Sequence, residues 1–132
     1  MGDVCNVLVV EDHDAVRATL GQVVEHEGYR FTLVANALEA RRAVEREGFD
    51  VAIVDVTLPG NEDGVLLADH LAGLGIAILL ISGDPAQLER IGRSRHMLLE
   101  KPFRLSELKD SLGKLLERSG TDCSPEVVRR GL

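Results

Sequence analysis

Four short runs of apolar residues, many of them β-branched, recur along the chain and limit what it can fold into. They span residues 7–10, 51–54, 76–81 and 97–99. Apolar runs of this length are typical of strands that are buried on both faces of a parallel sheet. A fifth segment, residues 29–34, alternates apolar and polar side chains, which is typical of a strand at a sheet edge.

Amphipathic segments separate these strands and predict helices. Asn36, followed three residues later by Glu39, has the spacing of a helix N-cap with a capping box. Two other segments place apolar residues at helical spacing, namely Val16, Leu20, Val23 and Val24, and then Leu108, Leu112, Leu115 and Leu116. Five strand-helix units account for residues 4–118, which we predict to form one domain. Residues 119–132 carry few apolar side chains, and we expect a flexible C-terminal tail.

The order of the strands follows from general rules of topology. Right-handed crossovers and short connections leave few ways to arrange five such units. The flavodoxin-like order 2-1-3-4-5 puts the alternating second strand at an edge, as its pattern requires. We therefore predict an α/β fold, a (βα)5 three-layer sandwich around a parallel sheet.

The balance of charges excludes some partners. Fifteen basic against 22 acidic residues give a net charge of −7, which repels phosphate backbones and anionic lipids. We therefore expect no direct binding to nucleic acid or membrane. No apolar run is long enough to span a bilayer and the N-terminus lacks a secretory pattern, so we expect a cytoplasmic protein. Cys5 and Cys123 lie far apart in the sequence, and we expect both to be reduced thiols.

Acidic residues end two of the predicted strands. Glu11 and Asp12 follow the first strand, and Asp55 follows the third. Ligands of open α/β sheets bind beyond the carboxyl ends of the strands, at a switch point that here lies between these two strands. Crowded carboxylates repel one another unless a cation neutralises them, and hard oxygen ligands suit Mg²⁺. The acidic run after the first strand also suits a simple helix N-terminus, and this alternative stays open.

Two other polar residues stand where predicted strands end. Ser82 follows the run 76–81, and Lys101 comes shortly after the run 97–99. Each residue alone is typical of a turn or of a solvated surface. Together with the three strand-end carboxylates, they predict a shared functional site.

Four motifs surround these residues: VVED at 9–12, VDVTLP at 54–59, ISG at 81–83 and KPF at 101–103. In sequence and in order they resemble the motifs of response regulator receiver domains, which belong to bacterial two-component systems. The resemblance covers residues 4–118. Within the family, the chain resembles stand-alone receivers of the chemotaxis-regulator type.

This resemblance implies a phosphoacceptor and a metal. Asp55 would accept a phosphoryl group. Asp12 and Asp55 would bind Mg²⁺ directly, Glu11 would bind it through a water molecule, and the carbonyl group of Thr57 would complete the ligands from the protein.

The same resemblance implies groups that bind the phosphoryl oxygens. Ser82 would donate a hydrogen bond to one of them, Gly83 would leave room for it, and Lys101 would form an ion pair with it. The peptide bond between Lys101 and Pro102 would be cis. These roles agree with in-line phosphoryl transfer, which needs an aligned nucleophile, a shared metal and fixed positive charge.

The implied phosphodonor is a phosphohistidine on a sensor histidine kinase or a histidine phosphotransfer protein. The product would be an acyl phosphate that hydrolyses, so the domain would catalyse its own phosphorylation and dephosphorylation and would not be an enzyme in the ordinary sense. The implied output is contact with a downstream protein target or onward phosphotransfer. Leu98 departs from the family, which usually carries Tyr or Phe there, and the short span from Ser82 to Lys101 predicts a curtailed fourth helix.

Two other functions stay open. One is a receiver-like fold that serves only as a constitutive binding module, although Asp12, Asp55, Ser82 and Lys101 argue against it. The other is an Mg²⁺-dependent phosphatase with an aspartyl nucleophile. Such phosphatases carry a DxD motif on the first strand, whereas here Thr57 stands two positions after Asp55.

Overall fold

Five parallel strands form one sheet at the centre of the computed structural model, which describes residues 5–58, 63–87, 91 and 96–119. The strands are β1 (Asn6–Val10), β2 (Arg30–Val34), β3 (Val51–Asp55), β4 (Ala77–Ser82) and β5 (Met97–Glu100). Their order is β2-β1-β3-β4-β5, and every neighbouring pair is parallel. The predicted topology is confirmed, with the alternating strand β2 at an edge.

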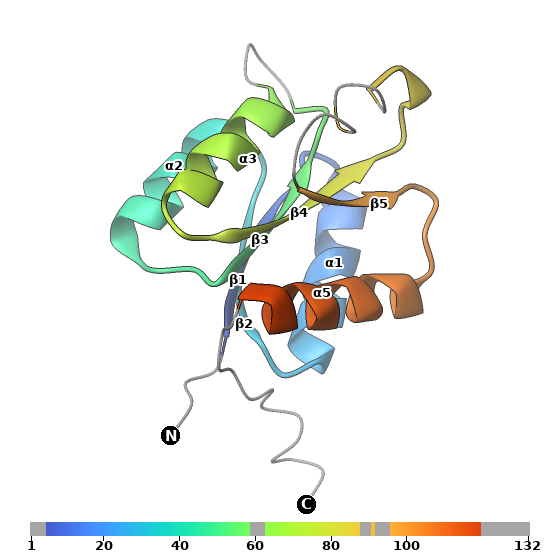
Figure 1. Cartoon of the computed structure of the whole chain (residues 1–132), viewed down its shortest axis with the longest axis horizontal. Coiled ribbons are helices and arrows are strands. Elements are labelled where there is room, and N and C mark those ends of the chain that lie inside the picture. Colours follow the sequence, from blue (N-terminus) through green and yellow to red (C-terminus); the bar gives the residue numbers. More distant parts are fainter. Residues whose placement is uncertain (1–4, 59–62, 88–90, 92–95, 120–132) are drawn as a thin grey trace, which may run out of the picture.

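Helices cover both faces of the sheet. They are α1 (Asp14–His26), α2 (Ala37–Arg46), α3 (Gly64–Gly73) and α5 (Leu105–Ser119), with a short 3-10 turn at Pro85–Gln87. Helices α1 and α5 lie on one face, and α2 and α3 lie on the other (Figure 1). This is the three-layer sandwich that the sequence predicts. Within the described part of the chain, no helix combines the length and the apolar character needed to cross a membrane.

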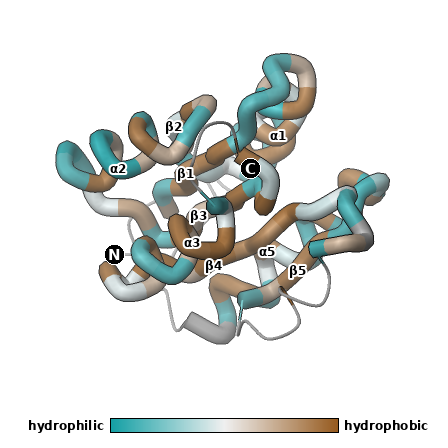
Figure 2. Tube along the Cα trace, turned by 90° about the horizontal axis from the view of Figure 1, so that it is seen from above, coloured by the Kyte–Doolittle hydropathy of each residue, from teal (hydrophilic) through white to brown (hydrophobic). Residues whose placement is uncertain are grey.

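The strands send alternate side chains into two apolar cores. Val7, Val9 and Ile53 belong to the core beneath α1 and α5. Leu8 and Val54 belong to the core beneath α2 and α3. Figure 2 shows apolar residues on the strands in the middle and many of the polar residues on the helices. Because hydrocarbon fills both faces of the sheet, the place left for polar groups is at the strand ends.

Local hydrogen bonds define two helix starts. The Asn36 side chain accepts a 2.9 Å bond from the Glu39 N–H, and the Glu39 carboxylate accepts a 2.9 Å bond from the Ala35 N–H, which confirms the predicted capping box. Asp84 accepts a 2.9 Å bond from the Ala86 N–H and so caps the 3-10 turn. The predicted curtailment of the fourth helix concerns residues that lie mostly outside the described ones.

The prediction that Cys5 is a reduced thiol is wrong. Cys5, which precedes β1, is fully buried and disulfide-bonded, where we expected a reduced thiol. The reason is that separation along the sequence does not tell which cysteines meet in the folded chain. Cys123 and the predicted tail lie outside the described residues, apart from Ser119, which ends α5.

Gly64 begins α3 where the backbone after β3 leaves no room for a side chain. A Cβ atom on Gly64 would lie 2.3 Å from the carbonyl oxygen of Asp55 and 2.6 Å from the Cα of Val56. The Gly64 N–H also donates a 3.1 Å hydrogen bond to the Val56 carbonyl. The start of α3 is therefore packed directly against the strand end that carries Asp55.

We predict that Gly64→Ala lowers the free energy of unfolding by about 1–3 kcal/mol, because the added methyl group forces the two backbones apart. Urea denaturation measures this change. Gly113→Ala is the matched control, since Gly113 lies inside α5 with open space at its Cβ position. Better helix propensity should raise the stability of the control by up to about 1 kcal/mol. Wild-type stability in Gly64→Ala would contradict the packing described here.

Candidate functional site

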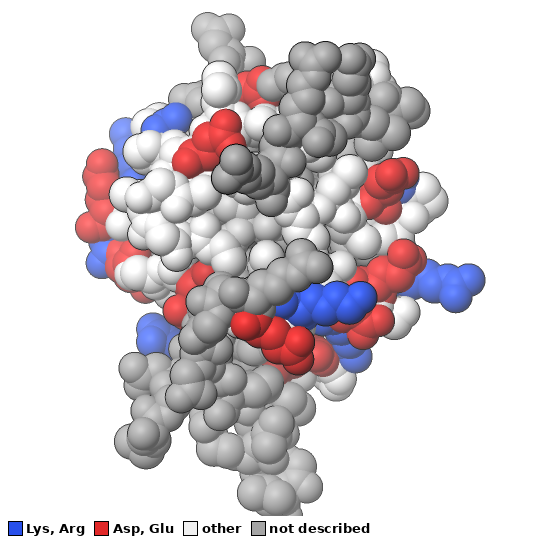
Figure 3. Space-filling view, in the orientation of Figure 1, with Lys and Arg blue, Asp and Glu red and all other residues white. Residues whose placement is uncertain are grey.

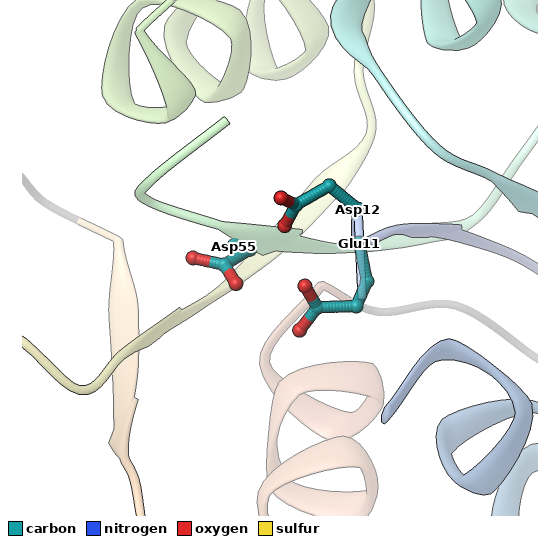
Figure 4. Close-up of side chains that lie close together, drawn as sticks. All are labelled: Glu11, Asp12 and Asp55. Atoms are coloured by element: carbon teal, nitrogen blue, oxygen red, sulfur yellow. The ribbon is translucent and has the colours of Figure 1, made fainter. Parts of the chain in front are cut away.

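Three carboxylates meet where β1 and β3 end. The register pairs Val10 with Val54, so the next residues, Glu11 and Asp55, come side by side, with Asp12 following. One oxygen of each carboxylate lies within 4.8 Å of the others, and Figure 4 shows the three side chains gathered at these strand ends. Glu11 and Asp55 are 1% and 7% exposed, whereas Asp12 is exposed. The structure thus brings together the three carboxylates that the sequence predicts.

The ammonium group of Lys101 bridges two of these carboxylates. Its Nζ lies 3.0 Å from Glu11 Oε1 and 3.0 Å from Asp55 Oδ2. Lys101 directly follows β5, and its peptide bond to Pro102 is cis, as the resemblance implies. A Cβ atom on Gly83 would lie 3.3 Å from the Cβ of Lys101. Gly83 therefore leaves room for the stem of the lysine at the end of β4.

Burial and repulsion perturb the ionisation of the site. The pKa of Glu11 is raised from 4.5 to about 7, first because its carboxylate is buried and then because Asp55 lies beside it, while Lys101 acts in the opposite direction. Burial disfavours the charged form of Lys101 as well, but its bonds to Asp55 and Glu11 outweigh burial and raise its pKa. One ammonium group does not fully compensate these carboxylates, so a further cation would be stabilised here.

Backbone amides hold the two buried carboxylates in place. Asp55 Oδ1 accepts a 2.9 Å hydrogen bond from the Thr57 N–H, and Glu11 Oε2 accepts a 3.2 Å bond from the His13 N–H. Each buried carboxylate therefore has one oxygen on a backbone amide and the other on Lys101. This arrangement fixes the direction in which Asp55 presents its oxygens.

Ser82 is the last residue of β4, so it lies at the carboxyl ends of the strands, as the three carboxylates do. Ile81, the residue before it, is in register with Asp55. The Ser82 hydroxyl accepts a 3.3 Å hydrogen bond from the Asp84 N–H, and its carbonyl accepts a 2.8 Å bond from the Lys101 N–H. Ser82 thus links the backbone of Lys101 to β4, and its hydroxyl engages the loop that follows.

Capping of α1 explains only part of the acidic run. The N-cap residue is His13, whose side chain makes no capping bond. Asp14 lies in the first turn, where its charge complements the helix dipole. Glu11 and Asp12 precede the cap, and their carboxylates lie near Asp55 instead. The helix-start alternative therefore accounts for Asp14 and leaves the other two for the site.

Arg17 also belongs to this region, and sequence reasoning missed it. Its guanidinium group donates a 3.0 Å hydrogen bond to the carbonyl oxygen of Glu11. Its position three residues after Asp14 is the spacing of an ion pair on one helix face, which is the signal that could have drawn attention to it.

The fold and the strand-end cluster define an α/β domain of the receiver type. Residues 7–113 match the response regulator receiver domain family. The chain belongs to this family.

Relatives differ in how much of their length this chain covers. Sporulation initiation phosphotransferase F of Bacillus subtilis is 29% identical over 83% of this chain and 92% of that protein. Transcriptional activator protein PfeR of Pseudomonas aeruginosa is 32% identical over 94% of this chain, but over only 42% of its own length. Response regulator MprA of Mycobacterium leprae is covered over 55% of its length. The chain thus spans about half the length of the last two relatives.

Solved structures share the fold over nearly their whole length. Response regulator protein TrrA of Thermotoga maritima, in complex with Mg²⁺ and beryllium fluoride, is 25% identical with a TM-score of 0.77, over 86% of this chain and 100% of that one. The signal receiver domain of a modulated diguanylate cyclase from Desulfovibrio desulfuricans is 32% identical with a TM-score of 0.79, over 89% and 98%.

We predict that Glu11 makes the metal-free protein less stable as the pH rises from 4.5 to about 7. In this range the unfolded chain has lost the Glu11 proton while the folded chain keeps it, so a higher pH favours unfolding. Glu11→Gln should remove this contribution from the pH dependence of Tm, measured with EDTA present. Glu45→Gln, at an exposed position of α2, should keep the wild-type dependence. An unchanged pH dependence in Glu11→Gln would show that the carboxylate titrates normally.

Proposed function

We propose that this receiver domain accepts a phosphoryl group on Asp55 from a phosphohistidine, with Mg²⁺ bound beside it. The observation that carries the proposal is the buried strand-end carboxylate of Asp55, 3.0 Å from the Lys101 ammonium and next to two further carboxylates. Together these groups supply a nucleophile, fixed positive charge and metal ligands. Membership of the receiver family and the similarity to sporulation initiation phosphotransferase F support the proposal.

Asp55 would act as the nucleophile. One of its oxygens would attack the phosphorus atom, forming an O–P bond while the N–P bond to the donor imidazole breaks. The electron pair of that bond would stay on the imidazole nitrogen, and the donor would leave as a neutral imidazole that carries its proton on the other ring nitrogen. The product is an acyl phosphate, which water hydrolyses to Asp55 and inorganic phosphate. Lys101 would pair with the phosphoryl oxygens, and the Ser82 hydroxyl would donate to one of them. The domain would catalyse these two steps on itself and turn over no separate substrate.

Mg²⁺ suits the donor set around Asp55, because it prefers carboxylate and carbonyl oxygens and keeps several of its waters. Asp12 and Asp55 would bind the ion directly, Glu11 through water, and Thr57 through its carbonyl. The exposed position of Asp12 leaves this side of the site open to solvent. When bound, the ion would supply positive charge that reduces the repulsion between the carboxylate and the phosphoryl oxygens. The Mg²⁺ complex of TrrA supports this choice of metal.

The proposed donor is a sensor histidine kinase or a histidine phosphotransfer protein, and we place the exchange in the cytoplasm. The proposed output is contact with a downstream protein or onward phosphotransfer. A direct role at nucleic acid is disfavoured by the net charge of −7. Figure 3 agrees, since Lys and Arg side chains on the visible face are scattered among acidic and neutral residues.

Leu98 makes the response at β5 differ from the usual switch of the family. It is half-buried, lies in register with Leu80 and packs against the core beneath α2 and α3. The Tyr or Phe that the family usually carries here would fill the space that Ser82 leaves when it moves toward the phosphoryl group. Leu98 has no ring to fill that space and no hydroxyl to form a hydrogen bond there. A ligand shifts an equilibrium only through interactions that differ between the two states. We therefore place the response chiefly in the loop after β4, where the Ser82 hydroxyl accepts from the Asp84 N–H.

We predict that acetyl phosphate and Mg²⁺ add one acid-stable, base-labile phosphoryl group to the protein, and that Asp55→Asn prevents this because the nucleophile is lost. Intact-protein mass spectrometry measures the labelling. Asp110→Asn, at an exposed position of α5, is the control and should be labelled like the wild type. Labelling of a folded Asp55→Asn variant would place the acceptor elsewhere. Rapid turnover of a phosphomonoester would favour the phosphatase alternative.

We also predict that beryllofluoride with Mg²⁺ shifts the amide NMR signals of Ser82, Gly83 and Asp84 more than those of β5. The phosphoryl mimic would engage the Ser82 hydroxyl, so the Asp84 N–H would lose its present acceptor. Amide spectra recorded with and without the mimic test this, and Asp55→Asn should show neither change. Large shifts confined to residues 97–100, with the loop silent, would rule out a response through the loop.

A further inference from the structure

Arg17 links α1 to the acidic segment that precedes it. Its Nη1 lies 3.0 Å from the carbonyl oxygen of Glu11 and 3.4 Å from that of Asp12. Its Nη2 lies 2.6 Å from Asp14 Oδ1. The Arg17 side chain is 21% exposed, so most of it is packed against the protein. One guanidinium group therefore contacts three of the four residues from Glu11 to Asp14.

The contact with Glu11 completes the backbone hydrogen bonding of a buried residue. The Glu11 N–H donates a 3.1 Å bond to the carbonyl of Val34 at the end of β2, and the Glu11 carbonyl accepts from Arg17. Glu11 is 1% exposed, so water does not readily replace a lost partner. Both backbone polar groups of Glu11 are thus held, one by the neighbouring strand and one by the following helix.

We propose that Arg17 is a positioning residue for the metal site, one that acts through the backbone carbonyls of Glu11 and Asp12 and does not touch the ion. This inference rests on the proposed binding of Mg²⁺ by these two residues. By holding their peptide groups, Arg17 keeps both carboxylates near Asp55 before the ion arrives, so less ordering is needed when it binds. Groups that orient metal ligands in this way commonly influence affinity strongly.

The shape of the guanidinium group matters here as well as its charge. Arginine presents several N–H donors in one fixed plane, whereas lysine has a compact ammonium group on a flexible stem. A lysine at this position would keep the charge but would not span the Glu11 carbonyl and the Asp14 carboxylate with separate nitrogens. Asp14 is 92% exposed, and an ion pair at such a site contributes little to stability. The carbonyl contacts therefore carry the positioning role.

Calorimetric titration of the whole protein with Mg²⁺ tests this role. We expect Arg17→Lys and Arg17→Met each to weaken binding by about 10-fold or more. Arg42→Met, at an exposed position of α2 on the opposite face of the sheet, is the matched control and should keep wild-type affinity. Without metal, the hydrogen-bonded amides of Glu11 and His13 should exchange hydrogen faster in both Arg17 variants, while the amides of β3 should not change.

The outcomes separate positioning from other roles. Wild-type affinity in a folded Arg17→Met variant would overturn the positioning role. Full affinity in Arg17→Lys with a loss in Arg17→Met would show that charge alone acts, and would overturn it as well. Absence of Mg²⁺ binding by the wild type would instead count against the proposed function. In that case amide exchange still decides, because an unchanged rate at Glu11 and His13 in both variants would show that Arg17 does not hold the segment.

Discussion

Repulsion between buried carboxylates, balanced in part by the ammonium group of Lys101, is the interaction on which the rest of the site depends. Glu11 and Asp55 share this one ammonium group at 3.0 Å each, and a third carboxylate lies close by. The pKa of Glu11 is raised first by burial and then by Asp55, and Lys101 only partly offsets these effects. An additional cation would relieve this imbalance. A phosphoryl group on Asp55 would add negative charge and draw Lys101 toward itself, so the cation would then be needed more. Metal binding and phosphoryl transfer would therefore be linked through one set of contacts.

The sheet creates this imbalance by its register. Strands β1 and β3 are neighbours, and Val10 at the end of β1 pairs with Val54, so the residues that follow these two have to meet. Strand β4 ends beside β3, and β5 delivers Lys101 next to Ser82. With apolar cores on both faces, the carboxylates have only the strand ends to occupy. Gly64 lets the start of α3 pack closely against the end of β3, and this contact supports the strand end that bears Asp55.

Much of this arrangement could be predicted from the sequence, because the spacing and the composition of apolar residues indicate which side chains are buried. The strands, their order and the meeting of Glu11, Asp12 and Asp55 follow from apolar runs and from where they end. Contacts that depend on how far a long side chain extends, and in which direction, could not be predicted in this way. The sharing of Lys101 by two carboxylates depends on the path of its stem past Gly83, and the contact of Arg17 with the Glu11 carbonyl depends on the turn before α1. The bonding of Cys5 was wrongly predicted, since chain separation carries no information on distance in space.

A crystal structure of the protein with Mg²⁺ and beryllofluoride tests most directly whether Asp55 is the phosphoacceptor and Lys101 its cationic partner. We expect beryllofluoride on an Asp55 oxygen, the Lys101 Nζ turned from Glu11 toward the fluorides, and a cation among Glu11, Asp12 and Asp55. An Asp55 without beryllofluoride under saturating conditions, with Lys101 still 3.0 Å from both carboxylates, would contradict this assignment.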